Sequence, residues 1–127
     1  MDTSALVSFD IENGDRVIKA LADDGKDPDV ALWAKLPDYE DWRLVIASNR
    51  LDQSSPLSGY EAINAAMQKA GISYRQRPTI SWRPMDKPFI QALRNVFASA
   101  ANTYGMRLGG QVFGDQYLED AFVYRIH

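Results

Sequence analysis

The chain has 127 residues and a mass of 14.3 kDa, a size at which one domain with one hydrophobic core is expected. Hydrophobic residues make up 46% and charged residues 24%, which excludes a mainly disordered or fibrous chain. The sequence contains no cysteine, which excludes a disulfide scaffold, a cysteine nucleophile and every thiolate metal site. Its single histidine, His127, stands last, so we expect no histidine-based catalytic triad or metal site.

The net charge of −3 is divided unevenly along the sequence. Residues 1–61 carry 13 acidic and 6 basic residues, whereas residues 62–127 carry 4 acidic and 8 basic residues. This asymmetry can produce two faces of opposite potential, but we expect folding to interleave both sets on the surface. No segment approaches the roughly 20 apolar residues of a membrane span, and the N-terminus lacks a signal-peptide pattern. We therefore expect a soluble cytoplasmic protein.

The N-terminal segment allows two interpretations. Residues 7–11 alternate between apolar and polar before Asn13-Gly14, which is typical of a β-hairpin. Residues 10–22 also place apolar side chains at helical spacing, with acidic residues in the first turn, where the helix dipole favours them. We favour the helix, although a glycine inside it costs about 1 kcal/mol relative to alanine.

Two later segments alternate in the manner of half-buried strands. Residues 30–48 contain two such runs around a polar centre, which predicts a hairpin with a loop of about five residues. Residues 105–126 predict a second hairpin in the same sheet, with Gly114-Asp115 in the turn and residues 121–126 as a strand. Gly109-Gly110 indicates a β-bulge, or a place where another backbone or a ligand comes close.

Two helices and a short strand are predicted between these hairpins. The first helix covers residues 57–70 and ends at Gly71; its apolar stripe comprises Tyr60, Ile63, Met67 and Ala70. Asp86 is expected to cap the second helix, with Pro88 in its first turn and an apolar face of Phe89, Leu93, Val96, Phe97 and Ala100. Residues 79–83, between two prolines, predict one strand at a sheet edge.

The resulting order is α-ββ-α-β-α-ββ. It predicts a single α+β domain over residues 1–127, with a mainly antiparallel sheet of about five strands packed against helices. The segments DIENGDRVIKAL, VALWAKLPDYEDWRLVIAS and GMRLGGQVFGDQYLEDAFVYRI, in this order and spacing, resemble a group of short bacterial α+β proteins labelled hypothetical. The resemblance covers most of the chain. It implies the N-terminal helix and a bacterial cytoplasmic origin, and it brings no activity with it.

An acidic turn is the first candidate for chemistry. Asp38, Glu40 and Asp41 place three carboxylates within four residues, which Mg²⁺ or Ca²⁺ could bind. The spacing lacks the glycine and distal glutamate of an EF-hand, and a solvated turn accounts for it, so we expect no metal and no cofactor. Phosphate-cradle, dinucleotide and nucleophile-elbow motifs do not occur, so the sequence does not support an enzyme.

A second candidate lies around the last strand. Arg107 is expected to pair with Asp120 across the second hairpin, and Tyr124 and Arg125 share the strand that follows. A structural ion pair is the simpler interpretation. The alternative is a polar pocket beside Gly109-Gly110, in which Arg107 or Arg125 binds an anionic group.

The most basic stretch covers residues 74–94. Its five basic residues and the two aromatic residues interleaved among them, opposed only by Asp86, are Tyr74, Arg75, Arg77, Trp82, Arg83, Lys87 and Arg94. Arginine binds phosphate and an aromatic ring stacks on a base, which is the chemistry of single-stranded nucleic acid binding. The sequence pI of about 5.0 argues against this partner, and we expect Trp82 in the core.

These observations favour a non-enzymatic module that binds another protein, or its own copy, through a sheet edge such as residues 79–83 or through an aromatic face. The alternative is a weak nucleic-acid or phosphate-directed binder or enzyme that uses the basic stretch and Arg107. The candidate binding residues are Arg75, Arg77, Trp82, Arg83, Arg107, Asp120, Tyr124 and Arg125.

Overall fold

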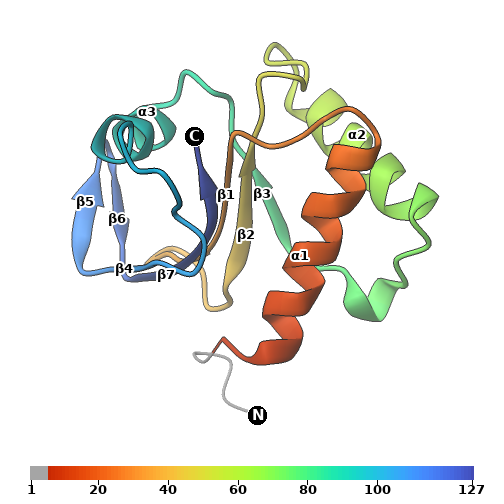
Figure 1. Cartoon of the computed structure of the whole chain (residues 1–127), viewed down its shortest axis with the longest axis horizontal. Coiled ribbons are helices and arrows are strands. Elements are labelled where there is room, and N and C mark those ends of the chain that lie inside the picture. Colours follow the sequence, from red (N-terminus) through yellow and green to blue (C-terminus); the bar gives the residue numbers. More distant parts are fainter. Residues whose placement is uncertain (1–5) are drawn as a thin grey trace.

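A five-stranded sheet forms the middle of three layers (Figure 1). The computed structural model describes residues 6–127. The elements are α1 (Ser8–Asp23), β1 (Val30–Lys35), β2 (Arg43–Ala47), α2 (Pro56–Lys69), the 3-10 helix η1 (Tyr74–Gln76), β3 (Ile80–Trp82), α3 (Pro88–Val96), β4 (Arg107–Leu108), β5 (Gln111–Phe113), β6 (Gln116–Leu118) and β7 (Asp120–Ile126). Within this described part of the chain, no helix is long and apolar enough to cross a membrane.

The main sheet has the strand order β3-β2-β1-β7-β4. The central strand β1 pairs antiparallel with β2 and β7, and β4 pairs antiparallel with β7. The edge strand β3 runs parallel to β2, because α2 carries the chain back across the sheet between them. The α+β class, the element order and the edge position of residues 79–83 are therefore confirmed.

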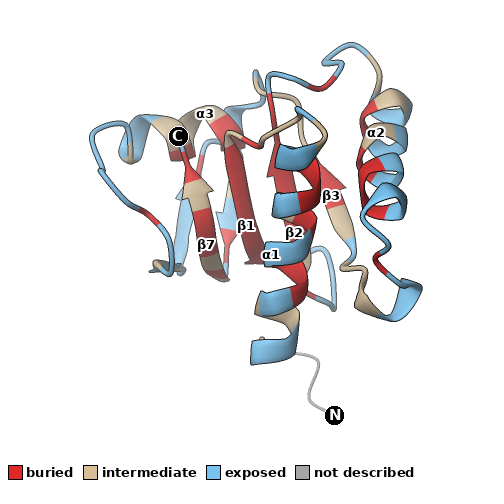
Figure 2. Ribbon diagram, turned by 45° about the vertical axis from the view of Figure 1, so that its right-hand side comes forward, coloured by how far each residue is buried: buried red, intermediate tan, exposed pale blue. Residues whose placement is uncertain are grey.

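Each face of the sheet has its own apolar cluster. On one face, Ala31, Trp33 and Tyr124 pack against α1 and α2. On the other face, Val30, Leu32 and Ala34 of β1 pack against α3 and the β5–β6 hairpin. Figure 2 shows the buried residues on the sheet and on the inward sides of the helices. Because both faces of β1 are covered, its sequence is a nearly continuous apolar run.

The N-terminal segment is a helix, as predicted, and Asn13-Gly14 lies inside it. Both residues are buried. The Oδ1 atom of Asn13 accepts a hydrogen bond of 2.7 Å from Nη1 of Arg16. Gly14 lies against the ring and hydroxyl of Tyr124, where a Cβ atom would collide with the side chain. Close packing of α1 on β7 therefore explains the glycine, and no turn is needed there.

The prediction for α3 is correct in position and wrong at both ends. Lys87 rather than Asp86 precedes the helix as its N-cap, without a side-chain hydrogen bond, and Pro88 is the first helical residue. The helix ends at Val96, which is 60% exposed, and Ala100 lies beyond it. A helix of nine residues makes about two and a half turns. Its buried face consists of Phe89, Ile90 and Leu93. Phe97 is half-buried against the same cluster.

The prediction of one hairpin over residues 105–126 is wrong in its sheet assignment. The turn at Gly114-Asp115 is present, but the strands around it, β5 and β6, form a separate two-stranded sheet. The strands that join the main sheet are β4 and β7. Gly109 lies against the backbone of Glu119, and Gly110 has a φ of +71°, so the two glycines turn the chain out of the sheet. The expected close approach of a backbone at Gly109-Gly110 is confirmed.

Candidate functional site

The acidic turn lies exposed in the loop between β1 and β2. Tyr39 is partly covered by the guanidinium of Arg43, whose central carbon lies 3.7 Å from the ring centroid. Within residues 6–127, no group of three or more His, Cys, Asp or Glu side chains is arranged to hold a metal ion. The three carboxylates of this turn are exposed to solvent.

Arg107 and Asp120 form the ion pair that the sequence predicts. Nη2 of Arg107 lies 2.7 Å from Oδ2 of Asp120, and its Nε donates to the carbonyl of Ala121 at 3.0 Å. Oδ1 of Asp120 accepts from the backbone of Ala121 at 2.8 Å. Both side chains are about half exposed, so the pair contributes at most about 1 kcal/mol to stability. These contacts hold the start of β7 against β4.

Arg125 lies near the opposite end of β7 and has a different partner. Its Nη1 donates to Oδ2 of Asp27 at 2.9 Å. The two arginines therefore lie apart, and each is paired with an aspartate: Arg107 with Asp120 and Arg125 with Asp27.

Tyr124 is a buried structural residue. Its hydroxyl donates to the carbonyl of Ile11 at 2.7 Å and accepts from Nε1 of Trp33 at 2.9 Å. Nε1 of Trp33 also donates to the carbonyl of Asp10 at 3.2 Å. Burial of the hydroxyl raises the pKa of Tyr124, with the negative charge of Asp15 adding to the effect. This hydrogen-bond network ties α1 to β1 and β7 and leaves the buried hydroxyl without a hydrogen to donate to a ligand.

The aromatic residues of the basic stretch do not form one platform. Tyr74 is exposed, and the guanidinium of Arg77 lies 4.6 Å from its ring centroid while Nε of Arg77 donates to the carbonyl of Ile72. Trp82 is 4% exposed and packs against Gly59 of α2, so its expected place in the core is confirmed.

The basic residues of this stretch are also spread over the molecule. Arg75 is exposed on η1, and Nε of Arg83 donates to the hydroxyl of Ser81. Arg94 lies on α3, which packs on the other face of the sheet. Arg107 lies on β4, four strand spacings of about 4.8 Å from β3. A single phosphate-binding site cannot use Arg75, Arg83 and Arg107 together.

The sheet edge at β3 is short and partly occupied. The strand has three residues, and the backbone amide of Trp82 donates to the hydroxyl of Tyr60 on α2 at 3.2 Å. Pro78 and Pro84 flank the strand and have no amide hydrogen to donate. This edge offers an added strand few backbone partners.

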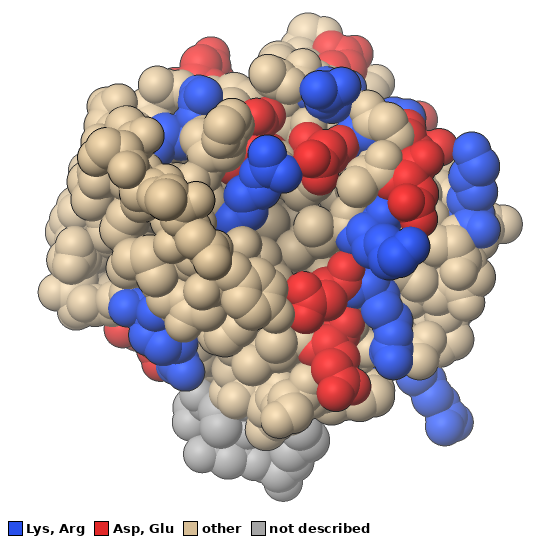
Figure 3. All heavy atoms as spheres, in the orientation of Figure 1, with Lys and Arg blue, Asp and Glu red and all other residues tan. Residues whose placement is uncertain are grey.

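A different stretch of the chain combines exposed apolar side chains with few charged residues. Residues 95–113 contain one charged residue, Arg107, which is paired with Asp120. Four large apolar side chains in or beside this stretch are exposed: Val96 (60%), Tyr104 (52%), Val112 (62%) and Tyr117 (44%). We call them, with the chain between α3 and β4 and the outer face of β5–β6, the uncharged surface. The left-hand side of Figure 3 shows a broad area without charged side chains, whereas both charges are mixed on the right.

The aromatic residues of the uncharged surface are held in place. Val112 and Tyr117 face each other across the β5–β6 pair, while the adjoining Phe113 and Leu118 are buried in the core. Tyr104 packs edge to face on Phe122, with ring centroids 5.8 Å apart, and its hydroxyl donates to Asp15 at 3.0 Å. Sequence analysis missed this surface because alternation shows which face of a hairpin is buried, not what the other face meets.

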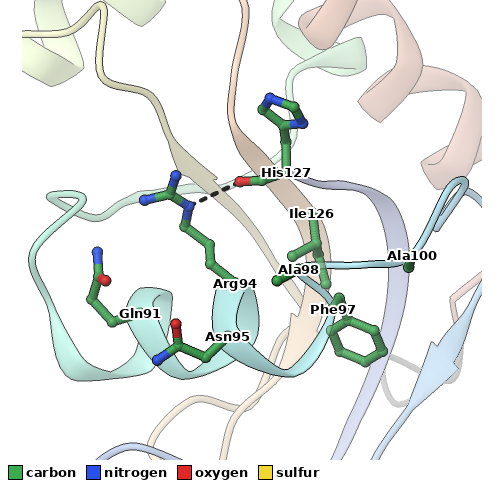
Figure 4. A pocket seen from close by; sticks show the side chains of 8 residues that line it. All are labelled: Gln91, Arg94, Asn95, Phe97, Ala98, Ala100, Ile126 and His127. Atoms are coloured by element: carbon green, nitrogen blue, oxygen red, sulfur yellow. Dashed lines mark hydrogen bonds between the residues drawn. The ribbon is translucent and has the colours of Figure 1, made fainter.

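A hollow of about 450 Å³ lies between the end of α3 and the end of β7 (Figure 4). Its lining residues are Gln91, Arg94, Asn95, Phe97, Ala98, Ala100, Ile126 and His127. Ala100, Ile126 and His127 also line an adjoining hollow of about 320 Å³. Sequence analysis had no signal for this site, because α3 and β7 are brought together only by the fold.

Comparisons with protein-family models, with curated proteins and with solved structures each find no match to this chain. The fold and its surfaces therefore define the class of protein: an α+β domain with a mixed five-stranded sheet, covered by helices on one face and by a helix and a hairpin on the other. The resemblance to short bacterial proteins stays a prediction.

Proposed function

We propose that this protein is a non-enzymatic interaction module of a bacterial cytoplasm, which binds a protein partner or a second copy of itself through the uncharged surface. The observation that supports this most strongly is the exposure of Val96, Tyr104, Val112 and Tyr117 around a stretch with one paired charge. The bacterial and cytoplasmic setting rests on the sequence resemblance alone.

The composition of the uncharged surface matches the chemistry of protein interfaces. The centres of such interfaces are depleted of charged residues and enriched in aromatic residues. Tyrosine contributes a large rigid ring at low entropic cost, and its hydroxyl can still form a hydrogen bond at the rim. Tyr104 and Tyr117 are therefore the side chains we expect to contribute most to binding.

The aromatic face is a better candidate than the sheet edge. At β3, the amide of Trp82 is already bonded to Tyr60, so strand addition would have to break that contact. The alternative of a nucleic-acid or phosphate-directed protein has less support, because the arginines that it needs lie on different faces and edges of the sheet.

The test uses two charge insertions at equally exposed apolar positions. Val112→Lys places a charge on the uncharged surface, and Leu57→Lys places one on α2, where Leu57 is 68% exposed. Light scattering at about 10 and 100 µM measures self-association, and affinity capture from a bacterial host extract measures binding of another protein. We expect Val112→Lys to abolish the association that wild type and Leu57→Lys share. The proposal is contradicted if the wild type stays monomeric and captures no protein whose binding is lost in Val112→Lys.

A further inference from the structure

We propose that Arg43 of β2 and Arg83, the residue after β3, together bind a phosphate group on the face of the sheet against which α3 packs. Val45 and Ser81 are paired directly across β2 and β3, and Val45 belongs to the apolar cluster on that face. Because side chains of a strand alternate between its two faces, Arg43 and Arg83, each two residues from this pair, lie on the same face. The site uses no residue of the uncharged surface and is independent of the proposed function.

Arg83 is positioned by a buried serine. Its backbone amide donates to the carbonyl of Ile46 at 2.9 Å, which keeps the residue in line with β3. Its Nε donates to the hydroxyl of Ser81 at 3.0 Å, and Ser81 is 7% exposed. The central carbon of the guanidinium lies 5.8 Å from the ring centroid of Phe89. Neither terminal nitrogen has a hydrogen bond or ion pair with any residue from 6 to 127, so both are available to a ligand.

Arg43 lacks a hydrogen-bond acceptor altogether. The central carbon of its guanidinium lies 3.7 Å from the ring centroid of Tyr39, and its Nε is closed off from solvent without a partner. Within the described part of the chain, no acceptor and no carboxylate pairs with any of its five N–H groups. A buried donor without an acceptor is unfavourable and rare in folded proteins. Its presence here indicates that the acceptor comes from a ligand.

The two arginines are close enough to share one ligand. Arg43 is a diagonal neighbour of Ser81 across β2 and β3. With a rise of about 3.3 Å per residue and a strand spacing of about 4.8 Å, the Cα atoms of Arg43 and Ser81 are about 8 Å apart, a distance that long side chains span. The guanidinium of Arg83 already lies at Ser81. A phosphate group at this place can therefore meet N–H groups from both strands.

The neighbouring residues leave the positive charge of the pair unbalanced. Besides the two arginines, this face of β2 and β3 carries Val45, Ala47, Thr79 and Ser81. None of these is acidic. The acidic turn borders Arg43 through Tyr39, but its carboxylates are exposed and none of them forms an ion pair with Arg43. Nζ of Lys35 donates to the carbonyl of Tyr39 at 2.9 Å and brings a further cation to this turn.

The geometry of the two guanidiniums suits phosphate. An aromatic ring against the face of a guanidinium leaves the N–H groups at its edge free to bind phosphate oxygens in pairs. Phosphate carries up to two negative charges and accepts hydrogen bonds at several oxygens, which matches two cations that have donors and no acceptor. Arg107 and Arg125 differ, because each is paired with an aspartate.

The experiment is an NMR titration of ¹⁵N-labelled protein with sodium phosphate at about pH 7, against sodium chloride at the same ionic strength. We expect saturable shifts of the Nε–H signals of Arg43 and Arg83 with phosphate and not with chloride. Arg83→Gln should weaken phosphate binding about tenfold, the effect of losing one charge-assisted contact. Arg75→Gln, a change at an exposed arginine on η1, should leave the Kd for phosphate unaltered.

Arg43→Met tests the second arginine in a variant that should fold normally. Methionine keeps an aliphatic contact with Tyr39 and removes the buried N–H group that has no acceptor, so the Tm should be the same or higher. Phosphate binding should again weaken about tenfold. A lower Tm would show that the fold itself requires the guanidinium of Arg43, which would contradict its assignment to a ligand.

The proposal is overturned if the wild type shows no saturable shifts up to about 20 mM phosphate, or if chloride produces the same shifts. It is also overturned if either Arg43→Met or Arg83→Gln binds phosphate as tightly as the wild type. Equal weakening in Arg75→Gln would show that phosphate responds only to the net charge of the protein, which would overturn the proposal as well.

Discussion

Two hydrogen bonds at the hydroxyl of the buried Tyr124 connect the first helix to the sheet. Tyr124 donates to the carbonyl of Ile11 and accepts from Trp33, so one side chain of β7 satisfies a carbonyl of α1 and an indole of β1. A buried polar group left without its partner costs about 1–3 kcal/mol.

Tyr124→Phe should therefore lower the free energy of unfolding by about 1–2 kcal/mol, because the hydrogen bonds of its hydroxyl with Ile11 and Trp33 are lost. Urea melts measure the change. The matched control is Tyr104→Phe, which removes an exposed hydroxyl bonded to Asp15 and should cost under about 0.5 kcal/mol. Equal losses of unfolding free energy for the two variants would show that the buried hydroxyl contributes no more to stability than the exposed one.

Gly14→Ala should destabilise the protein, although alanine is the better helix former by about 1 kcal/mol. The added Cβ meets the hydroxyl and ring of Tyr124, and overpacking of this kind costs about 1–3 kcal/mol. In a double-mutant cycle, Tyr124→Phe should relieve part of that cost because it removes the atom nearest to the new methyl group. A stabilised Gly14→Ala variant would mean that α1 does not lie this close to β7.

The stability of the protein at alkaline pH should depend on Tyr124. Burial raises the pKa of Tyr124 above its ordinary value of 10.0, so the unfolded chain ionises this group before the folded chain does. The stabilisation is thus fully present below about pH 10 and is lost as the pH rises further. Between pH 9 and 11 the wild type should lose more stability in urea melts than Tyr124→Phe. Parallel losses would contradict the raised pKa.

At the scale of elements, the sequence predicts where strands and helices occur better than it predicts which neighbours they choose. The alternation in residues 105–126 and the Gly114-Asp115 turn are real, but they fit a hairpin in either sheet. Gly109-Gly110 marks a change of direction, while the place where the chain then packs depends on α3, far away in sequence. The Arg107–Asp120 pair was predictable because the two residues flank that hairpin.

The helix α3 gives the sharpest test at this scale. Ile90 is fully buried and was absent from the predicted apolar face, whereas Val96 was included and is 60% exposed. Ile90→Ala should cost about 2–5 kcal/mol in urea melts and Val96→Ala under about 0.5 kcal/mol. If Val96→Ala cost more stability than Ile90→Ala, the apolar face predicted from the sequence would be right and the observed end of α3 would be contradicted.

In the whole molecule, the acidic first half of the chain and the basic second half are not separated into two faces. Lys69 pairs with Asp24, and Arg125 pairs with Asp27, so folding joins the halves through ion pairs, as expected from the composition. The large charge-free area lies in the second half, around the chain between α3 and β4. Net charge could not predict it, because it depends on where neutral residues remain exposed.

We propose that another protein binds at the uncharged surface. The most direct measurement is photo-cross-linking inside a bacterial host, with benzoylphenylalanine placed at position 112 in β5 or, as a matched exposed position, at 57 in α2. We expect a discrete cross-linked product from position 112 only, with twice the mass of the chain if the partner is a second copy. No product from position 112, or the same products from both positions, would contradict it.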